Sequence, residues 1–216
     1  MTIKTTTMNL KFLRLFTVAI GLPFVIHAQT NSSNYISFSG GLSFNGTGDN
    51  IGPIVGFEYG SKKLNRNWIW SAGFGATIHS DTGIPLVFQY QGNTIDGTVR
   101  ETNAGIQIFS HLGYSFIKNS SHLFTLKAGG LLRYQSNSAT YGVYTLFPAL
   151  TGLNYPVYVF ENKYPQITFA AGVSTQFSYT YKLNSKLGLG IVGGFQFDSN
   201  GDNISQLNLS ITRFLK

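Results

Sequence analysis

Strict alternation between apolar and small polar residues is the feature that most constrains how this chain can fold. It is clearest in "VSTQFSYTYKLNSKLGLGIVGGFQFD" (173–198), where nearly all odd positions on either side of KLNSK are apolar or aromatic. The even positions are mostly Ser, Gln, Thr and Gly, and Val192 is the only large apolar residue among them. A period of two places alternate side chains on opposite faces of a strand. This segment therefore predicts two strands, each with one apolar and one polar face.

The same pattern recurs along the chain and predicts eight strands. The first sets Phe38 and Leu42 against Ser39 and Ser43, and the others follow the same rule. Most are at least as long as the ~9–11 residues that a tilted membrane strand needs, and no helical period competes with them. The predicted strands are 34–45, 51–60, 68–79, 104–116, 122–134, 166–181, 187–198 and 205–214.

The composition favours strands that lie in a membrane. Charged residues make up 11% of the chain, whereas a soluble domain has about 25%. A soluble sheet keeps Lys and Glu on its wet face, but this chain has Ser, Gly, Gln and Thr there. Lys and Arg outnumber acidic residues by 15 to 8. They are spread over turns and do not cluster with aromatic residues, so we predict no nucleic-acid partner. The absence of Cys excludes disulfides and thiol chemistry.

The first 28 residues are typical of a signal peptide. An apolar run, "LFTVAIGLPFVI" (15–26), follows a basic start and is too short to span a bilayer as a helix. We expect cleavage before Gln29, which leaves one domain at 29–216 for export. A start at Met8 would also leave a working signal, and the alternative is a buried N-terminal helix. The basic residues of the segment are Lys4, Lys11 and Arg14.

The connections between the predicted strands alternate in length. Those at 61–67, 117–121 and 182–186 are short, whereas those at 80–103 and 135–165 are long. This rhythm is typical of an outer-membrane barrel with short periplasmic turns and longer outer loops. The fold class predicted is therefore an all-β, eight-stranded antiparallel up-and-down transmembrane β-barrel with both termini in the periplasm. The short turns carry Lys and Arg without an acid, and most acidic residues lie at the opposite end.

Aromatic residues gather at the strand ends beside the short turns. Amphipathic rings settle at a membrane interface, so we expect these residues to form an inner aromatic girdle. The alternative is the margin of a sandwich core, which would not need its aromatics gathered at one end. The girdle residues predicted are Tyr59, Trp68, Trp70, Tyr114, Phe116, Phe124, Tyr179 and Tyr181.

A family resemblance follows from these features. Turns such as "YTYKLNSKLGLG" combine an aromatic-x-aromatic ending, a Lys/Asn turn and a Leu-Gly-Leu-Gly restart. The chain over 29–216 resembles the outer-membrane β-barrel domain family, the small porin-like barrels of Bacteroidota-type bacteria, and is similar in architecture to the OmpA and OmpX barrels. The resemblance implies an integral outer-membrane protein that contacts outer-membrane lipid, lipopolysaccharide and the barrel-assembly machinery. The ending "TRFLK" departs from the family, because many such barrels end in an aromatic residue.

The interior of an eight-stranded barrel is roughly filled by side chains, so we expect no wide pore. Glu58, Lys127 and Arg133 fall on the predicted inner face. Charges that face a low-dielectric enclosure should be paired. We therefore predict an ion pair between Glu58 and Lys127, with Arg133 in the same interior group, that acts as a structural plug. The alternative is a gate.

The most enzyme-like run is "HSDTG" (79–83). A Ser nucleophile needs a base within hydrogen-bond reach and an orienting acid. His79, Ser80 and Asp81 are consecutive, and adjacent strand residues point to opposite faces. We therefore predict that the chain is not an enzyme and binds no cofactor or metal, since its four His residues are scattered. The alternatives are a lipid A-modifying outer-membrane enzyme and a soluble ligand-binding β-barrel.

The connection at 135–165 is rich in aromatic residues, which are common in binding surfaces on rigid scaffolds. It could equally form a lid over the barrel mouth. We expect a monomer with a structural or interaction role and at most small-solute passage. An extracellular protein or glycan would bind at 80–103 and 135–165. The binding residues predicted are Tyr141, Tyr144, Phe147, Tyr155, Tyr158 and Phe160.

Overall fold

The computed structural model describes residues 32–46, 50–63, 67–118, 121–162 and 164–215. The predicted signal peptide lies outside the described residues. Within the described ranges, no helix has both the length and the apolar character needed to cross a bilayer.

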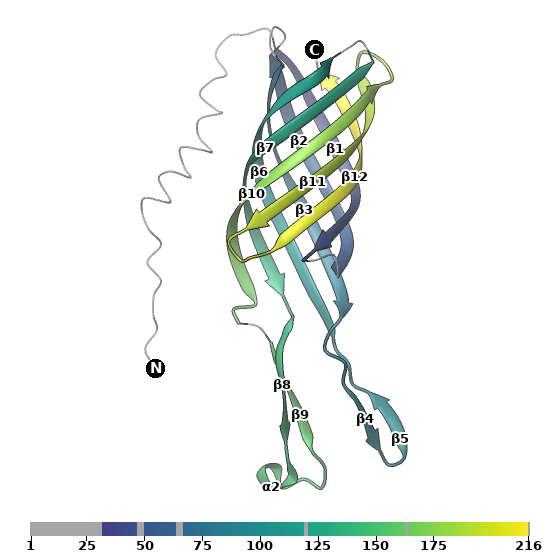
Figure 1. The fold of residues 1–216 in the computed structure, drawn as a ribbon, viewed down its shortest axis with the longest axis vertical. Coiled ribbons are helices and arrows are strands. Elements are labelled where there is room, and N and C mark those ends of the chain that lie inside the picture. The colour runs from purple at the N-terminus through teal and green to yellow at the C-terminus, as the bar shows by residue number, and fades with distance from the viewer. Residues whose placement is uncertain (1–31, 47–49, 64–66, 119–120, 163, 216) are drawn as a thin grey trace, which may run out of the picture.

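Eight long antiparallel strands close into a barrel, which confirms the predicted fold class (Figure 1). Each strand pairs with its neighbour along the barrel, and β1 pairs with β12 to close the ring. Seven of the eight predicted strands lie within the observed ones, and the predicted 166–181 begins one residue early. The barrel strands are β1 (Ser32–Asn45), β2 (Asn50–Lys63), β3 (Trp68–Thr82), β6 (Arg100–Lys118), β7 (His122–Asn137), β10 (Ile167–Lys182), β11 (Leu187–Asp198) and β12 (Asn203–Leu215).

The two long connections contain more structure than the sequence predicts. The first holds the hairpin of β4 (Val87–Tyr90) and β5 (Asn93–Asp96). Its two turn residues, Gln91 and Gly92, both have positive φ, as a tight two-residue hairpin turn requires. The second connection holds β8 (Thr140–Leu146), the short helix α2 (Pro148–Thr151) and β9 (Val157–Asn162). The strands are short and flanked by turn residues, which hides them in a search for long alternating segments.

Both hairpins project from the end of the barrel opposite the C-terminus (Figure 1). The pairs β3–β6 and β7–β10 lead into them. A lid folded over the barrel mouth, one of the alternatives for 135–165, is therefore not what the structure shows.

The barrel has an apolar outer face and a polar inner face. In the opening segment, Val173 and Phe177 are 64% and 50% exposed, whereas Ser174 and Gln196 are 7% and 4% exposed. The predicted assignment of the faces is therefore confirmed. The apolar belt of outward side chains includes Phe38, Leu42, Val55, Phe74, Ile106, Ile108, Leu112, Leu126, Val173, Phe177, Leu189, Ile191, Phe195, Leu207, Leu209 and Ile211.

Glycine allows the strands to curve tightly around this narrow interior. A Cβ at Gly129 would collide with the carbonyl oxygen of Ser110, and one at Gly52 would collide with that of Ile78. Missing side chains at such positions permit the close approach of neighbouring strands that a small closed barrel needs.

Spin labels on neighbouring residues of β10 should report the two faces. A label at Phe177 is expected to be accessible to oxygen dissolved in lipid, and a label at Gln176, which lines the interior, is not. Because the chain has no Cys, a single introduced thiol directs each label. Equal accessibility of the two labels in phospholipid vesicles would contradict the membrane orientation.

Candidate functional site

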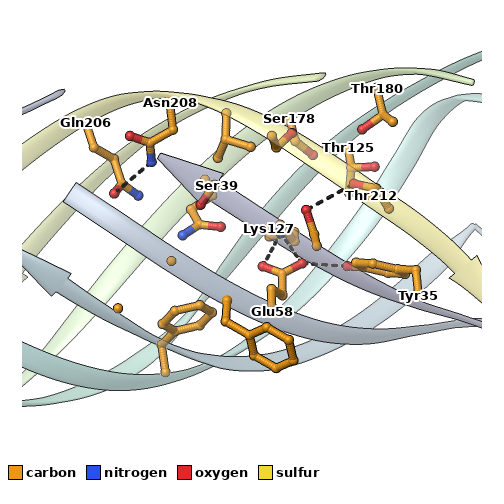
Figure 2. Close-up of a pocket in the computed structure, with 18 of the residues that line it drawn as sticks. Tyr35, Ser39, Glu58, Thr125, Lys127, Ser178, Thr180, Gln206, Asn208 and Thr212 are labelled. Atoms are coloured by element: carbon orange, nitrogen blue, oxygen red, sulfur yellow. Dashed lines mark hydrogen bonds and ion pairs between the residues drawn. The ribbon is translucent and has the colours of Figure 1, made fainter. Parts of the chain in front are cut away.

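A buried ion pair crosses the lumen in the half of the barrel where β1 begins and β12 ends. Lys127 Nζ on β7 lies 2.6 Å from Glu58 Oε2 and 2.7 Å from Glu58 Oε1 on β2. The hydroxyl of Tyr35 on β1 donates to Glu58 Oε1 at 2.7 Å. Figure 2 shows these three side chains pointing toward one another across the interior. The contacts supply the hydrogen bonds that a buried charge pair requires.

Arg133 does not join this pair, which corrects the predicted interior group. It lies six residues further along β7, about 20 Å at the rise of a strand. Its Nη2 donates to Thr77 Oγ1 at 3.0 Å. The carboxylates of Asp202 and Asp198, at the outer end of the barrel, attract its positive charge. Arg133 Nε and Nη1 have no hydrogen-bond partner among the described residues. The lumen therefore has two separate charged layers.

Polar pairs that the sequence analysis missed lie between and beside these layers. Gln107 and Gln196 donate to each other's carbonyl oxygen at 3.0 Å. His111 Nε2 lies 2.7 Å from Ser174 Oγ. The alternation of residue types predicts that all four side chains face inward. It does not predict which of them form hydrogen bonds with one another. Together with the ion pair, these contacts bridge the lumen at several levels and narrow it.

One cavity of about 70 Å³ lies beside the ion pair (Figure 2). Its lining includes Gln107, Asn208 and Thr212 as well as Glu58 and Lys127. This space has room for a few water molecules, since each needs roughly 10–15 Å³. The interior is therefore suited to water, not to the free diffusion of larger solutes.

The HSDTG run does not assemble into a catalytic group. His79 is buried in the lumen beside Ser43, with Nε2 and Oγ 2.8 Å apart. Ser80 is exposed on the opposite face and accepts from Thr102 Oγ1 at 3.4 Å. Asp81 Oδ1 accepts from the backbone N–H of Thr82. The three consecutive side chains therefore do not converge.

Two buried serine–histidine pairs remain, Ser43–His79 and Ser174–His111. A catalytic histidine is normally oriented by an acid on its second ring nitrogen. Nδ1 of each histidine has no hydrogen-bond partner among the described residues. No group of three or more His, Cys, Asp or Glu side chains in the described ranges could hold a metal ion. The pairs fit a packing role.

Four of the eight predicted girdle residues form a chain of ring contacts at the end of the barrel where β1 begins and β12 ends. Trp68 and Tyr114 rings lie 5.7 Å apart, Tyr114 and Phe116 lie 5.3 Å apart, and Phe116 and Phe124 lie 6.3 Å apart. On β10, Tyr179 and Tyr181 are exposed. Tyr59 and Trp70 are half-buried on the same outward face. Amphipathic rings at one end of an apolar belt match a membrane interface.

The two outer hairpins contact each other through aromatic rings. Phe88 on β4 lies 5.5 Å from Tyr158 on β9, and Tyr90 lies 6.4 Å from Tyr155. The hairpins therefore form one composite tip built from 80–103 and 135–165. We call this part the hairpin tip.

Large apolar and aromatic side chains are exposed on the hairpin tip. Tyr141 is 76% exposed, and Tyr144, Phe147 and Tyr155 are also exposed, whereas Phe160 is half-buried. The hydroxyl of Tyr144 donates to Glu161 Oε2 at 2.7 Å, and this carboxylate raises the pKa of Tyr144. Monomeric soluble proteins rarely expose such clusters without a binding role.

The fold and its faces define the class of protein. An apolar belt around a narrow polar lumen suits a barrel that spans a membrane, and eight strands with long hairpins at one end are typical of outer-membrane β-barrels. The sequence matches no protein-family model and no curated protein.

Solved outer-membrane barrels share the fold. Ail, the attachment invasion locus protein of Yersinia pestis, in complex with the heparin analogue sucrose octasulfate, is 10% identical with a TM-score of 0.50. The match covers 85% of this chain and 99% of Ail. Neisserial surface protein A is also 10% identical with a TM-score of 0.50, over 84% of this chain and 96% of that protein. At this identity the likeness concerns the fold alone.

Proposed function

We propose that this protein is an exported, monomeric outer-membrane barrel that binds an extracellular partner through its hairpin tip. The termini face the periplasm, the barrel-assembly machinery inserts it, and it contacts outer-membrane lipid and lipopolysaccharide. The barrel is a scaffold without enzymatic activity or a cofactor. One observation carries the proposal: two hairpins joined by ring contacts project beyond the barrel and expose aromatic side chains.

The narrow lumen supports a binding role over transport. The Glu58–Lys127 pair and the Gln107–Gln196 pair both reach across the interior. Passage through this lumen would be limited to water and the smallest solutes. Such passage would not explain why two hairpins project beyond the barrel.

The charge of the hairpin tip indicates the kind of partner. The two connections carry four carboxylates, Asp81, Asp96, Glu101 and Glu161, and two basic residues, Arg100 and Lys163. An acidic surface repels a sulfated ligand of the kind bound in the Ail structure. We therefore expect a neutral or basic partner, either a protein surface or an uncharged glycan whose sugar faces stack on aromatic rings.

Replacing Tyr141, Phe147 and Tyr155 together by Ser should lower binding to the partner more than about tenfold, because exposed aromatic anchors carry much of the energy of an interface. The measurement is binding of the nanodisc-embedded protein to an array of neutral glycans, sulfated glycans and extracellular matrix proteins. Tyr114→Ser, at the other end of the barrel, is the matched control. Equal binding by the triple variant, or a preference for sulfated glycans, would contradict the proposal.

A further inference from the structure

The second hairpin of the outer end finishes in an apolar turn. β8 and β9 pair as far as Leu146 and Val157, and the short helix α2 lies between them, far from the barrel (Figure 1). No residue from 141 to 160 is charged, and Thr151 has the only polar side chain within 146–153. We call residues 146–153 the apex.

The apolar side chains of the apex are open to solvent. Leu150 is 78% exposed, compared with 72% for Leu209 in the apolar belt of the barrel. Phe147 and Leu153 are exposed as well, and α2 contains no buried residue. The first hairpin, in contrast, turns through Gln and Gly at 91–92. One of the two hairpins therefore presents an apolar end, and such exposed patches mark interaction or membrane sites.

The backbone of the apex forms hydrogen bonds within itself. Leu150 N–H donates to the carbonyl oxygen of Phe147 at 2.9 Å, and Gly152 N–H donates to that of the first residue of α2 at 2.8 Å. Leu153 N–H donates to Thr151 Oγ1 at 3.3 Å. An unpaired N–H group is costly in an apolar medium. These contacts therefore lower the cost of placing the turn in such a medium.

A lipid bilayer fits this surface better than a protein does. Protein interfaces carry about one hydrogen bond per 100–200 Å² and a polar rim. The apex offers no charge, and its one polar side chain already accepts from Leu153 N–H. Burial at the boundary between headgroups and acyl chains needs no directional partner. Tyr144 and Tyr155 flank the apex and are exposed, as aromatic residues are at a membrane interface.

The carboxylates of the hairpins stand nearer the barrel than the apex does. Glu161 is the Cα partner of Gly142, four residues before Leu146, which is about 13 Å at the rise of a strand. Asp96 lies opposite Val87, at the barrel end of the first hairpin. Insertion to roughly 5–10 Å would leave both carboxylates in water. An anionic bilayer would repel them, whereas a zwitterionic one would not.

We propose that the apex inserts into the headgroup region of a zwitterionic phospholipid bilayer that faces the outer end of the barrel. This bilayer is not the one that the barrel spans, because the hairpins project away from the barrel (Figure 1). The inference rests on the outward projection that the proposed function also uses, and it adds a lipid surface as a second partner. Leu150 and Leu153 carry it, and neither belongs to the binding residues replaced in the array experiment.

The test measures binding of the nanodisc-embedded protein to added phosphatidylcholine vesicles by flotation. Leu150→Ser/Leu153→Ser should lower binding about tenfold, because it removes the apolar area that enters the bilayer. Val87→Ser/Ile95→Ser, two exposed apolar residues of the first hairpin, is the matched control and should leave binding unchanged. Vesicles that contain phosphatidylglycerol should bind the wild type more weakly. The shift in gel migration on heating checks that each variant keeps its barrel.

Three outcomes would overturn the proposal. The first is unchanged vesicle binding by the apex double variant, and the second is an equal loss in the control variant. The third is stronger binding to phosphatidylglycerol vesicles that high salt abolishes, which would assign the contact to charge. A failed glycan and protein array leaves the vesicle measurement unaffected, so the two proposals fail separately.

Discussion

Replacing Lys127 by Met is expected to destabilise the barrel by about 3 kcal/mol, because it leaves the Glu58 carboxylate buried without its cation. Lys127 is 5% exposed and contacts both oxygens of Glu58. Tyr35 would remain as a hydrogen-bond donor, but a single hydroxyl does not offset a full charge. The free energy of unfolding can be measured by reversible folding into phospholipid vesicles in guanidinium chloride.

The double variant Glu58→Gln/Lys127→Met separates lost charge pairing from lost packing. It removes both charges at similar volume and should recover most of the lost stability, since a buried pair often contributes little over neutral replacements. In planar bilayers, Lys127→Met should also favour cation passage, because Glu58 is then uncompensated. Unchanged stability and unchanged conductance in the single variant would contradict a role for the pair as a plug.

Replacing Leu209 by Arg should destabilise the membrane-inserted barrel by about 2–4 kcal/mol, because a cation on the lipid face near the midplane is costly. Leu209 is 72% exposed, and its Cα partners are Gly40 and Ile191 in the middle of the neighbouring strands. On a soluble barrel the same exposed position would tolerate Arg within about 0.5 kcal/mol. The measurement is the same vesicle-folding equilibrium.

Val87→Arg provides the matched control for this second result. Val87 is 60% exposed on β4 of the hairpin tip, outside the apolar belt. It should change stability little, because Arg there lies in water. If Leu209→Arg were as neutral as Val87→Arg, the barrel would not be embedded at that level.

The faces of the strands could be predicted because alternation is a local property. Each side chain points to the face that its odd or even position in the sequence indicates, as Val173, Ser174, Phe177 and Gln196 show. The scarcity of charge on the polar face then distinguishes a lumen from a solvent-exposed face, and the alternation of long and short connections indicates an up-and-down order of the strands. No long-range contact is needed for any of these steps.

The contacts inside the lumen could be predicted only in part. The alternation places Glu58, Lys127 and Arg133 inside, but it does not give their height, that is, their position along the barrel axis. Height depends on the tilt and stagger of the strands, which are properties of the closed sheet. That stagger brings Lys127 to Glu58 across 69 positions of sequence and leaves Arg133 beside Thr77.

The sequence by itself determined the inside-out barrel, its eight strands and the acidic and aromatic character of its long connections, because each depends on residue type and local spacing. The tertiary structure decided which interior side chains meet. It also decided that the long connections become two hairpins that touch through Phe88–Tyr158 and Tyr90–Tyr155. These contacts join residues far apart in the chain, and only the closure and register of the sheet fix the distances between them.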